Sequence, residues 1–185
     1  MRLVWPAPEY LASYKDALER GWSRDNIRGA AATREDLARI AADPEAFLAS
    51  LVDVEGVGTP IVLADGTTVK RLPGYSRWMW DGEFCGTIGF RWQPGTEALP
   101  PYCLGHIGYT VVEWKQRRGY ATQALAEILP DAKARGLRYV EITTGIENVA
   151  SQRVILANGG VVVEESVTPP SLGSKRDFRY RIDLR

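Results

Sequence analysis

This chain of 185 residues lacks the sequence features that mark several large classes of protein. Only two cysteines are present, Cys85 and Cys103, and no Cys-x-x-Cys motif, so neither a disulfide framework nor a zinc site is expected. Lys plus Arg and Asp plus Glu number 23 each, which leaves no overall charge to attract nucleic acid or an anionic membrane. No apolar run approaches the roughly 18 residues of a membrane span, and Met1 to Pro6 include no run typical of a secretory signal. We therefore expect a cytoplasmic protein without a metal, a nucleic-acid partner or a membrane partner.

Length and composition favour one globular domain. The apolar fraction of 45% and the charged fraction of 25% are close to the average for soluble proteins, and the length suits a single core. No internal repeat or low-complexity segment divides the chain. We therefore expect residues 1–185 to form one domain.

Apolar residues recur with a helical period near the start of the chain. This period predicts a helix from Glu9 to Arg20. A pattern like a capping box, Thr33 to Asp36, predicts the start of a second helix, and Asp43 followed by Pro44 predicts the start of a third.

From residue 60 the apolar period changes to two, which predicts strands. Asp81 and Gly82 form a tight-turn signal between two of them. The strands alternate with helices in the second half, which indicates an α/β fold with some parallel pairing. Strands are expected at 61–63, 69–80, 84–92, 104–112, 137–143, 161–165 and 178–184, and helices at 116–135 and 149–157.

A strand, a short basic loop and a helix start follow one another between Leu104 and Thr122. This order directs unpaired backbone N–H groups and the positive end of a helix at one point, which suits a phosphate. Gly119 lets the backbone approach an anion closely, and Arg117 and Arg118 can add charge. The same segment, taken alone, is equally compatible with an ordinary strand-to-helix turn with solvated arginines.

Two signatures resemble those of the GNAT superfamily of acetyl-CoA-dependent N-acetyltransferases. Gln116, Gly119 and Ala121 match Gln-x-x-Gly-x-Ala, the pyrophosphate loop of that family. The segment from Asn148 to Gly160 resembles its second signature, in which Asn opens a short helix that ends at a glycine. The resemblance is specific from about Leu104 to Gly160.

The resemblance implies a fold and a domain organisation. It implies an α/β fold with a mixed, mostly antiparallel central sheet of about seven strands and about four flanking helices, in which strands four and five splay apart. It also implies one N-acetyltransferase domain over residues 1–185, with an acyl-CoA-binding core at about 104–160. A homodimer is compatible with it.

The resemblance further implies acetyl-CoA as cosubstrate and a primary amine of a small molecule or peptide as acceptor. The diphosphate would rest on backbone amides of the loop, the pantetheine arm would pair with a strand edge, and the amine would attack the thioester directly. A strand N–H would stabilise the oxyanion. The cofactor-binding residues implied are Tyr109, Thr110, Val111, Gln116, Arg117, Arg118, Gly119, Tyr120, Ala121, Thr122, Asn148 and Ser151.

The acid and the base are less defined. Glu141 stands where some relatives that modify protein N-termini carry a carboxylate base, but a strand glutamate in a salt bridge is an alternative. His106 lies too far along its strand for direct contact, at about 3.3 Å per residue. Ile155 occupies the position of the family's usual tyrosine acid. The donor is then Tyr109, Ser151 or a water, or CoA leaves as the thiolate, since a thiol has a pKa near 8.5.

The acceptor region is expected to be rich in aromatic residues, which favours a flat or amphipathic amine over a strongly cationic one. A non-catalytic acyl-CoA sensor is the main alternative function. A different kind of nucleotide-binding protein is disfavoured, because no Walker-type lysine and no Gly-x-Gly-x-x-Gly run is present. The residues expected near the acceptor are Trp22, Arg24, Tyr75, Trp78, Trp80, Arg91, Trp92 and Tyr102.

Overall fold

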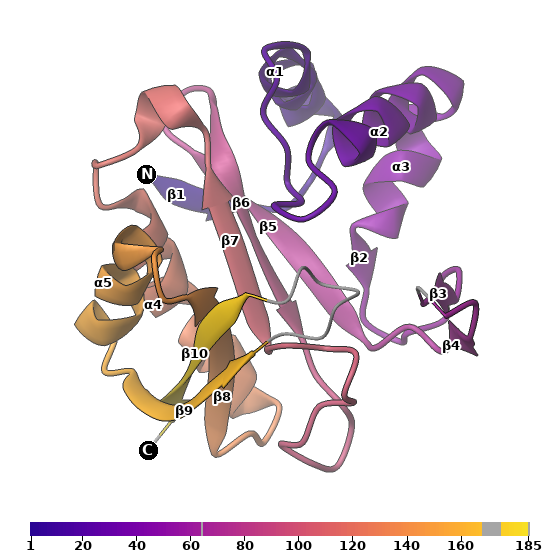
Figure 1. Ribbon diagram of the computed structural model, residues 1–185. Coiled ribbons are helices and arrows are strands. Elements are labelled where there is room, and N and C mark those ends of the chain that lie inside the picture. The colour runs from indigo at the N-terminus through magenta and orange to yellow at the C-terminus, as the bar shows by residue number, and fades with distance from the viewer. Residues whose placement is uncertain (64, 168–174, 185) are drawn as a thin grey trace.

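The computed structural model describes residues 1–63, 65–167 and 175–184 and shows an α/β architecture (Figure 1). Helices pack around two antiparallel sheets, and a separate short ribbon lies at the edge of the molecule. None of the helices in these ranges is long and apolar enough to cross a membrane.

The larger sheet has the strand order β1-β5-β6-β7, and β2 also pairs with β5. Residues 81–83 join β5 to β6, and Gly82 has a φ of 116°, so the tight turn predicted at Asp81 and Gly82 is confirmed. The strands β1 and β2 were not predicted, because three and two residues are too few to give a period. The bounds are β1 (Arg2–Val4), β2 (Val52–Asp53), β5 (Gly74–Trp80), β6 (Phe84–Arg91) and β7 (Ile107–Val111).

Three helices precede this sheet: α1 (Pro8–Glu19), α2 (Ala30–Ala42) and α3 (Pro44–Ser50). The prediction that Asp43 caps α3 is confirmed, because its carboxylate accepts a hydrogen bond from the Ala46 N–H at 2.9 Å.

The predicted capping box at the start of α2 is wrong, because the helix begins three residues earlier. The first and last residues of the predicted box, Thr33 and Asp36, are buried and form hydrogen bonds to other elements instead. The Thr33 hydroxyl donates to the Trp22 carbonyl at 3.0 Å, and the Asp36 carboxylate accepts from the Tyr14 hydroxyl at 3.1 Å. A capping signal and a buried polar contact look alike in sequence, because both require a small polar residue on a helix.

An aromatic cluster fixes α1 and α3 against the larger sheet. Tyr14 stacks on Trp78 with ring centroids 4.6 Å apart, and Phe84 meets both rings edge-on. Trp22 belongs to the same cluster and is 7% exposed. Two aromatic residues expected near the acceptor, Trp22 and Trp78, therefore stabilise the core.

The second half of the chain builds the smaller sheet, with the order β8-β10-β9. Every ladder among the described residues is antiparallel. The expected single mixed sheet flanked by about four helices therefore becomes two antiparallel sheets, a short ribbon and five α-helices in the described ranges. The remaining elements are β3 (Ile61–Val62), β4 (Thr68–Val69), the 3-10 turn η1 (Glu113–Lys115), α4 (Tyr120–Ala134), β8 (Tyr139–Gly145), α5 (Val149–Ala157), β9 (Val161–Val167) and β10 (Arg176–Asp183).

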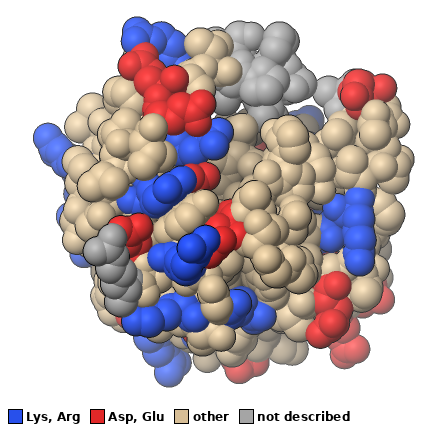
Figure 2. Space-filling model, turned by 90° about the horizontal axis from the view of Figure 1, so that it is seen from below, with Lys and Arg blue, Asp and Glu red and all other residues tan. Residues whose placement is uncertain are grey.

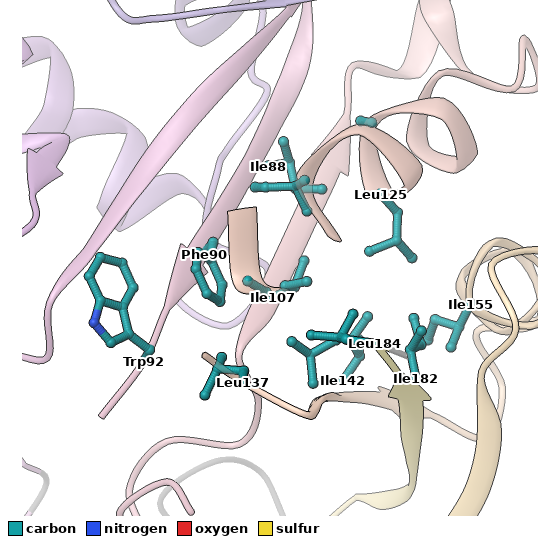
Figure 3. Close-up of a cluster of buried hydrophobic side chains, with 14 of the residues drawn as sticks. Ile88, Phe90, Trp92, Ile107, Leu125, Leu137, Ile142, Ile155, Ile182 and Leu184 are labelled. Atoms are coloured by element: carbon teal, nitrogen blue, oxygen red, sulfur yellow. The ribbon is translucent and has the colours of Figure 1, made fainter. Parts of the chain in front are cut away.

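One apolar core joins the two sheets through α4 (Figure 3). Leu125 and Ile128 on α4 are buried against both sheets, as the helical period predicts. Ile88 and Ile107 reach this core from the larger sheet, and Ile182 reaches it from the smaller one. The two sheets are thus held together by packing, with no ladder between them in the described part of the chain.

Among the described residues, hydrogen bonds join β8 to the part of the chain that builds the larger sheet only next to the start of β7. The His106 N–H donates to the Glu141 carbonyl at 2.7 Å, and the Glu141 N–H donates to His106 Nδ1 at 3.0 Å. The Thr143 hydroxyl donates to the Leu104 carbonyl. Beyond this seam, from Ile107 onward, the two strands separate, so the edge of β7 that faces β8 is open.

His106 makes the stability of this seam depend on pH. Its side chain is fully buried, its Nε2 has no partner among the described residues, and burial lowers the pKa of the imidazole below its ordinary value of 6.5. Between the lowered pKa and 6.5, the imidazole of His106 binds a proton in the unfolded chain but not in the folded chain. The stabilising contribution of the neutral imidazole is therefore complete above 6.5 and is lost as the pH falls through the lowered pKa.

We expect the free energy of unfolding to fall with pH below 6.5 more steeply in the natural chain than in His106→Gln, which keeps an acceptor on the side chain. One proton accounts for at most about 1.4 kcal/mol per pH unit. Urea unfolding at a series of pH values in both proteins measures the difference. Identical slopes would contradict the role given to His106.

Candidate active site

A groove of about 880 Å³ follows the open edge of β7. Its walls come from β7, the loop before α4, the first turn of α4, the end of β8 and the start of α5. It brings together residues far apart in the sequence, such as Tyr109 and Ser151. Of the residues predicted to bind the cofactor, all except the exposed Arg118 line it: Tyr109, Thr110, Val111, Gln116, Arg117, Gly119, Tyr120, Ala121, Thr122, Asn148 and Ser151.

The loop before α4 presents a row of unused donors to one end of the groove. In the described part of the chain, no protein acceptor binds the backbone N–H groups from Arg117 to Thr122. Gly119 is the N-cap with a φ of 75°, a conformation that favours glycine, and Arg117 adopts a φ of 61°, which is uncommon for a residue with a side chain. Free amides at a helix start suit an anion such as phosphate.

Acidic side chains in the turn between β5 and β6 hold this loop. Lys115 is buried and contacts Asp81 at 3.1 Å and Glu83 at 2.6 Å, and the Tyr120 hydroxyl donates to Asp81 at 2.6 Å. Burial alone raises the pKa of Asp81, but hydrogen bonds from Tyr120 and Lys115 outweigh it and lower that pKa to about 2. The carboxylate therefore stays charged and fixes both sides of the loop. Nothing in the sequence indicated this cluster, because Asp81 was assigned only to a turn.

Tyr109 and Ser151 meet across the groove. The two hydroxyl groups are 2.8 Å apart, and the Asn148 side chain accepts from the Ser151 N–H at 3.1 Å as the N-cap of α5. Burial raises the pKa of Tyr109 to about 12, although the hydrogen bond with Ser151 acts in the opposite direction. The phenol therefore carries its proton at neutral pH and can donate it.

Comparison with known proteins identifies the family. Residues 26–161 match the family described as "Acetyltransferase (GNAT) domain". The chain belongs to the GNAT acetyltransferase family. No curated protein sequence matches the chain significantly.

Solved structures of GNAT proteins share the fold at low sequence identity. The ribosomal L7/L12 alpha-N-protein acetyltransferase RimL, in complex with coenzyme A, is 15% identical with a TM-score of 0.61, over 99% of this chain and 94% of that chain. The microcin C7 self-immunity acetyltransferase MccE, in complex with acetyl-CoA and AMP, is 12% identical with a TM-score of 0.59, over 98% and 91%. At such identities the likeness establishes the fold alone.

The residue at the usual GNAT tyrosine position has no access to the groove. Ile155 is fully buried and points into the core (Figure 3). A Cβ at Gly160 would lie 2.4 Å from the Ile155 side chain, so the packing there is tight. Ile155 therefore takes no part in proton transfer, whereas Tyr109 and Ser151 both line the groove with hydroxyl groups.

Glu141 lies on β8 outside the lining of the groove. Its carboxylate contacts Arg181 at 2.8 Å and Arg179 at 3.7 Å, both on β10. Such pairs recur on this side of the molecule, where basic and acidic side chains lie next to one another instead of gathering by sign (Figure 2). The geometry favours the salt-bridge alternative, and a catalytic role for Glu141 stays a prediction.

A second cavity, of about 280 Å³, adjoins the groove. Arg24, Ser76, Gly89 and Arg91 line both. Of the aromatic residues expected near the acceptor, Tyr75 and Tyr102 line this cavity, whereas the tryptophans do not. No cluster of His, Cys, Asp or Glu within the described ranges could hold a metal ion.

Proposed function

We propose that this GNAT protein transfers the acetyl group of acetyl-CoA to a primary amine of a small molecule or peptide. One observation carries the proposal: the backbone amides from Arg117 to Thr122 bind no acceptor among the described residues, and all of these residues except Arg118 line a groove beside a split between two sheets. The amides would bind the diphosphate, since a helix start attracts anions and Arg117 adds a positive charge.

The open edge of β7 would bind the pantetheine arm. Within the described ranges β7 pairs only with β6, so backbone groups of Tyr109 to Val111 can form hydrogen bonds as if with an added strand. Asn148 and Ser151 lie across the groove within the same lining. This course directs the thioester from the α4 end of the groove toward the second cavity, where the amine would enter.

The reaction is acyl transfer from sulfur to nitrogen. The unprotonated amine attacks the thioester carbonyl, the C–N bond forms, the C–S bond breaks, and the amine loses a proton to solvent or a base. A backbone N–H of β7 would stabilise the oxyanion. Tyr109, which keeps its proton at neutral pH, would donate it to the departing sulfur and regain one from solvent, so the tentative catalytic assignment of Tyr109 is a donor role.

The test combines binding and turnover. Acetyl-CoA and ATP are compared by thermal unfolding, since a ligand present at 100 times its dissociation constant adds about 2.7 kcal/mol of stability. Release of the CoA thiol is then followed across a library of amines. Stabilisation by acetyl-CoA with turnover supports the proposal. Stabilisation without turnover of any amine supports the sensor alternative, and stabilisation by ATP alone overturns both.

Glu141→Gln separates a structural role from a catalytic one. Because two arginines hold the carboxylate, we expect the variant to lose about 2 kcal/mol of unfolding free energy while kcat changes less than about threefold. Glu164→Gln is the matched control, since Glu164 pairs with Arg179 at 3.3 Å on an exposed strand. A fall in kcat of about 100-fold in Glu141→Gln, with acetyl-CoA affinity unchanged, would instead identify Glu141 as the base.

A further inference from the structure

The second cavity meets the groove at the end remote from α4. Along the pairing of β6 with β7, Gly86 lies opposite Val111, next to the loop, whereas Gly89 lies opposite Gly108. Gly89 and Arg91 are both shared by the two cavities. The junction is therefore where an acceptor would lie if the thioester follows β7, and this step rests on the proposed function.

Most of the charged side chains that line the second cavity are positive. Three guanidinium groups, those of Arg24, Arg71 and Arg91, line it against one carboxylate, that of Asp53. Asp53 is already engaged, because its two oxygens accept backbone hydrogen bonds from Val57 at 3.0 Å and Gly58 at 2.9 Å. The lining thus has an excess of positive charge.

Two of these arginines differ in a way that suits ligand binding. Arg24 is held by the buried Asp36 through contacts of 2.6 Å and 3.0 Å. Arg91 is exposed and forms no ion pair and no side-chain hydrogen bond with any described residue. An unpaired guanidinium beside a second one held in place is a ready partner for a planar or tetrahedral anion, which it can bind through two hydrogen bonds.

We propose that the acceptor amine carries an anionic group, a carboxylate or a phosphate, which binds Arg91 at the junction of the two cavities. The anion would orient the acceptor so that its amine points into the groove toward the thioester. This assigns Arg91 as a specificity-determining residue and names the substrate class as amines with an acidic group. It also gives a reason for the weak fit of strongly cationic amines that the sequence indicated.

The experiment uses pairs of amines that share one carbon skeleton and differ only in whether they carry an anionic group. The first pair is 4-(2-aminoethyl)benzoate and 4-(2-aminoethyl)benzamide, and the second is O-phosphotyramine and tyramine. We expect kcat/KM for each anionic amine to exceed that of its neutral partner by about 10- to 100-fold, the usual worth of a charged hydrogen bond. The size of the effect in the two pairs distinguishes a carboxylate from a phosphate.

Variants locate the effect. Arg91→Met should lower the anionic-to-neutral ratio to about one, and Arg91→Lys should keep part of it. Arg34→Met is the control, because Arg34 is exposed on α2 and lines neither cavity, so its loss changes the net charge equally without changing the ratio. Calorimetric binding of the same four amines in the presence of CoA gives a readout that needs no turnover.

The outcomes separate this proposal from the proposed function. If acetyl-CoA binds and neutral amines are acetylated without preference for the anionic partner, only the present proposal fails. It also fails if Arg91→Met weakens acetyl-CoA itself and leaves the ratio unchanged, or if the anionic amines bind no better than the neutral ones. If acetyl-CoA does not bind, the proposed function fails, and charge-dependent amine binding still tests the role of Arg91.

Discussion

Gly119→Glu is expected to reduce acetyl-CoA binding by about 1,000-fold. A Cβ at Gly119 would meet no atom within 4 Å, so a side chain fits there, and Gly119 lines the groove in which the diphosphate is proposed to lie. A carboxylate about 4 Å from a like charge is opposed by about 4 kcal/mol near a protein surface, where the effective dielectric constant is about 20. Calorimetric titration with acetyl-CoA measures the loss.

Gly119→Gln is the matched control for this change. It has the same size and the same unfavourable φ of 75° but carries no charge, so it isolates the backbone and steric effects. We expect Gln to weaken binding much less than Glu, and both variants to unfold at similar temperatures. Equal affinities for the natural chain and Gly119→Glu would mean that the diphosphate does not bind at this loop.

Tyr109→Phe is expected to lower kcat by about 10- to 100-fold with little change in KM for acetyl-CoA. General-acid catalysis contributes roughly 100- to 10,000-fold, and a thiol that leaves easily near its own pKa of about 8.5 places the effect at the lower end. The loss should stay nearly constant from pH 6.5 to 9, because Tyr109, with a pKa raised to about 12, keeps its proton throughout. Steady-state kinetics over this pH range measure both effects.

Ser151→Ala distinguishes the two hydroxyl groups of this pair. It removes the partner that lies 2.8 Å from the Tyr109 hydroxyl but leaves the phenol in place. If Tyr109 is the donor, Ser151→Ala should lower kcat less than Tyr109→Phe does, and each variant should lose about 1 kcal/mol of stability from the broken hydrogen bond. A larger loss of kcat in Ser151→Ala would assign the donor role to Ser151.

Local features of this protein could be predicted from its sequence. Asp43 caps a helix, Asp81 and Gly82 form a turn, and Asn148 begins α5, because each depends on hydrogen bonds between residues close in the chain. The loop around Gly119 belongs to the same group, since a strand, a glycine and a helix start suffice to place free amides together.

Contacts between distant elements could not be predicted. Lys115 and Tyr120 bind Asp81 across 34 and 39 residues of chain, and Glu141 meets its arginines across about 40. Such pairs depend on strand register, and a shift of one residue turns a side chain to the other face. The division into two sheets was missed for the same reason, because packing through α4 replaces the expected ladder.

The hydrogen bonds between His106 and Glu141 also limit how far a cosubstrate can extend along β7. The separated part of β7 is only five residues long, from Ile107 to Val111, and it is closed at its lower end by hydrogen bonds to Glu141. A cosubstrate that enters beside α4 and follows this edge meets a fixed floor after about 17 Å. The seam would then stop the thioester beside the junction with the second cavity, where the acceptor is proposed to lie.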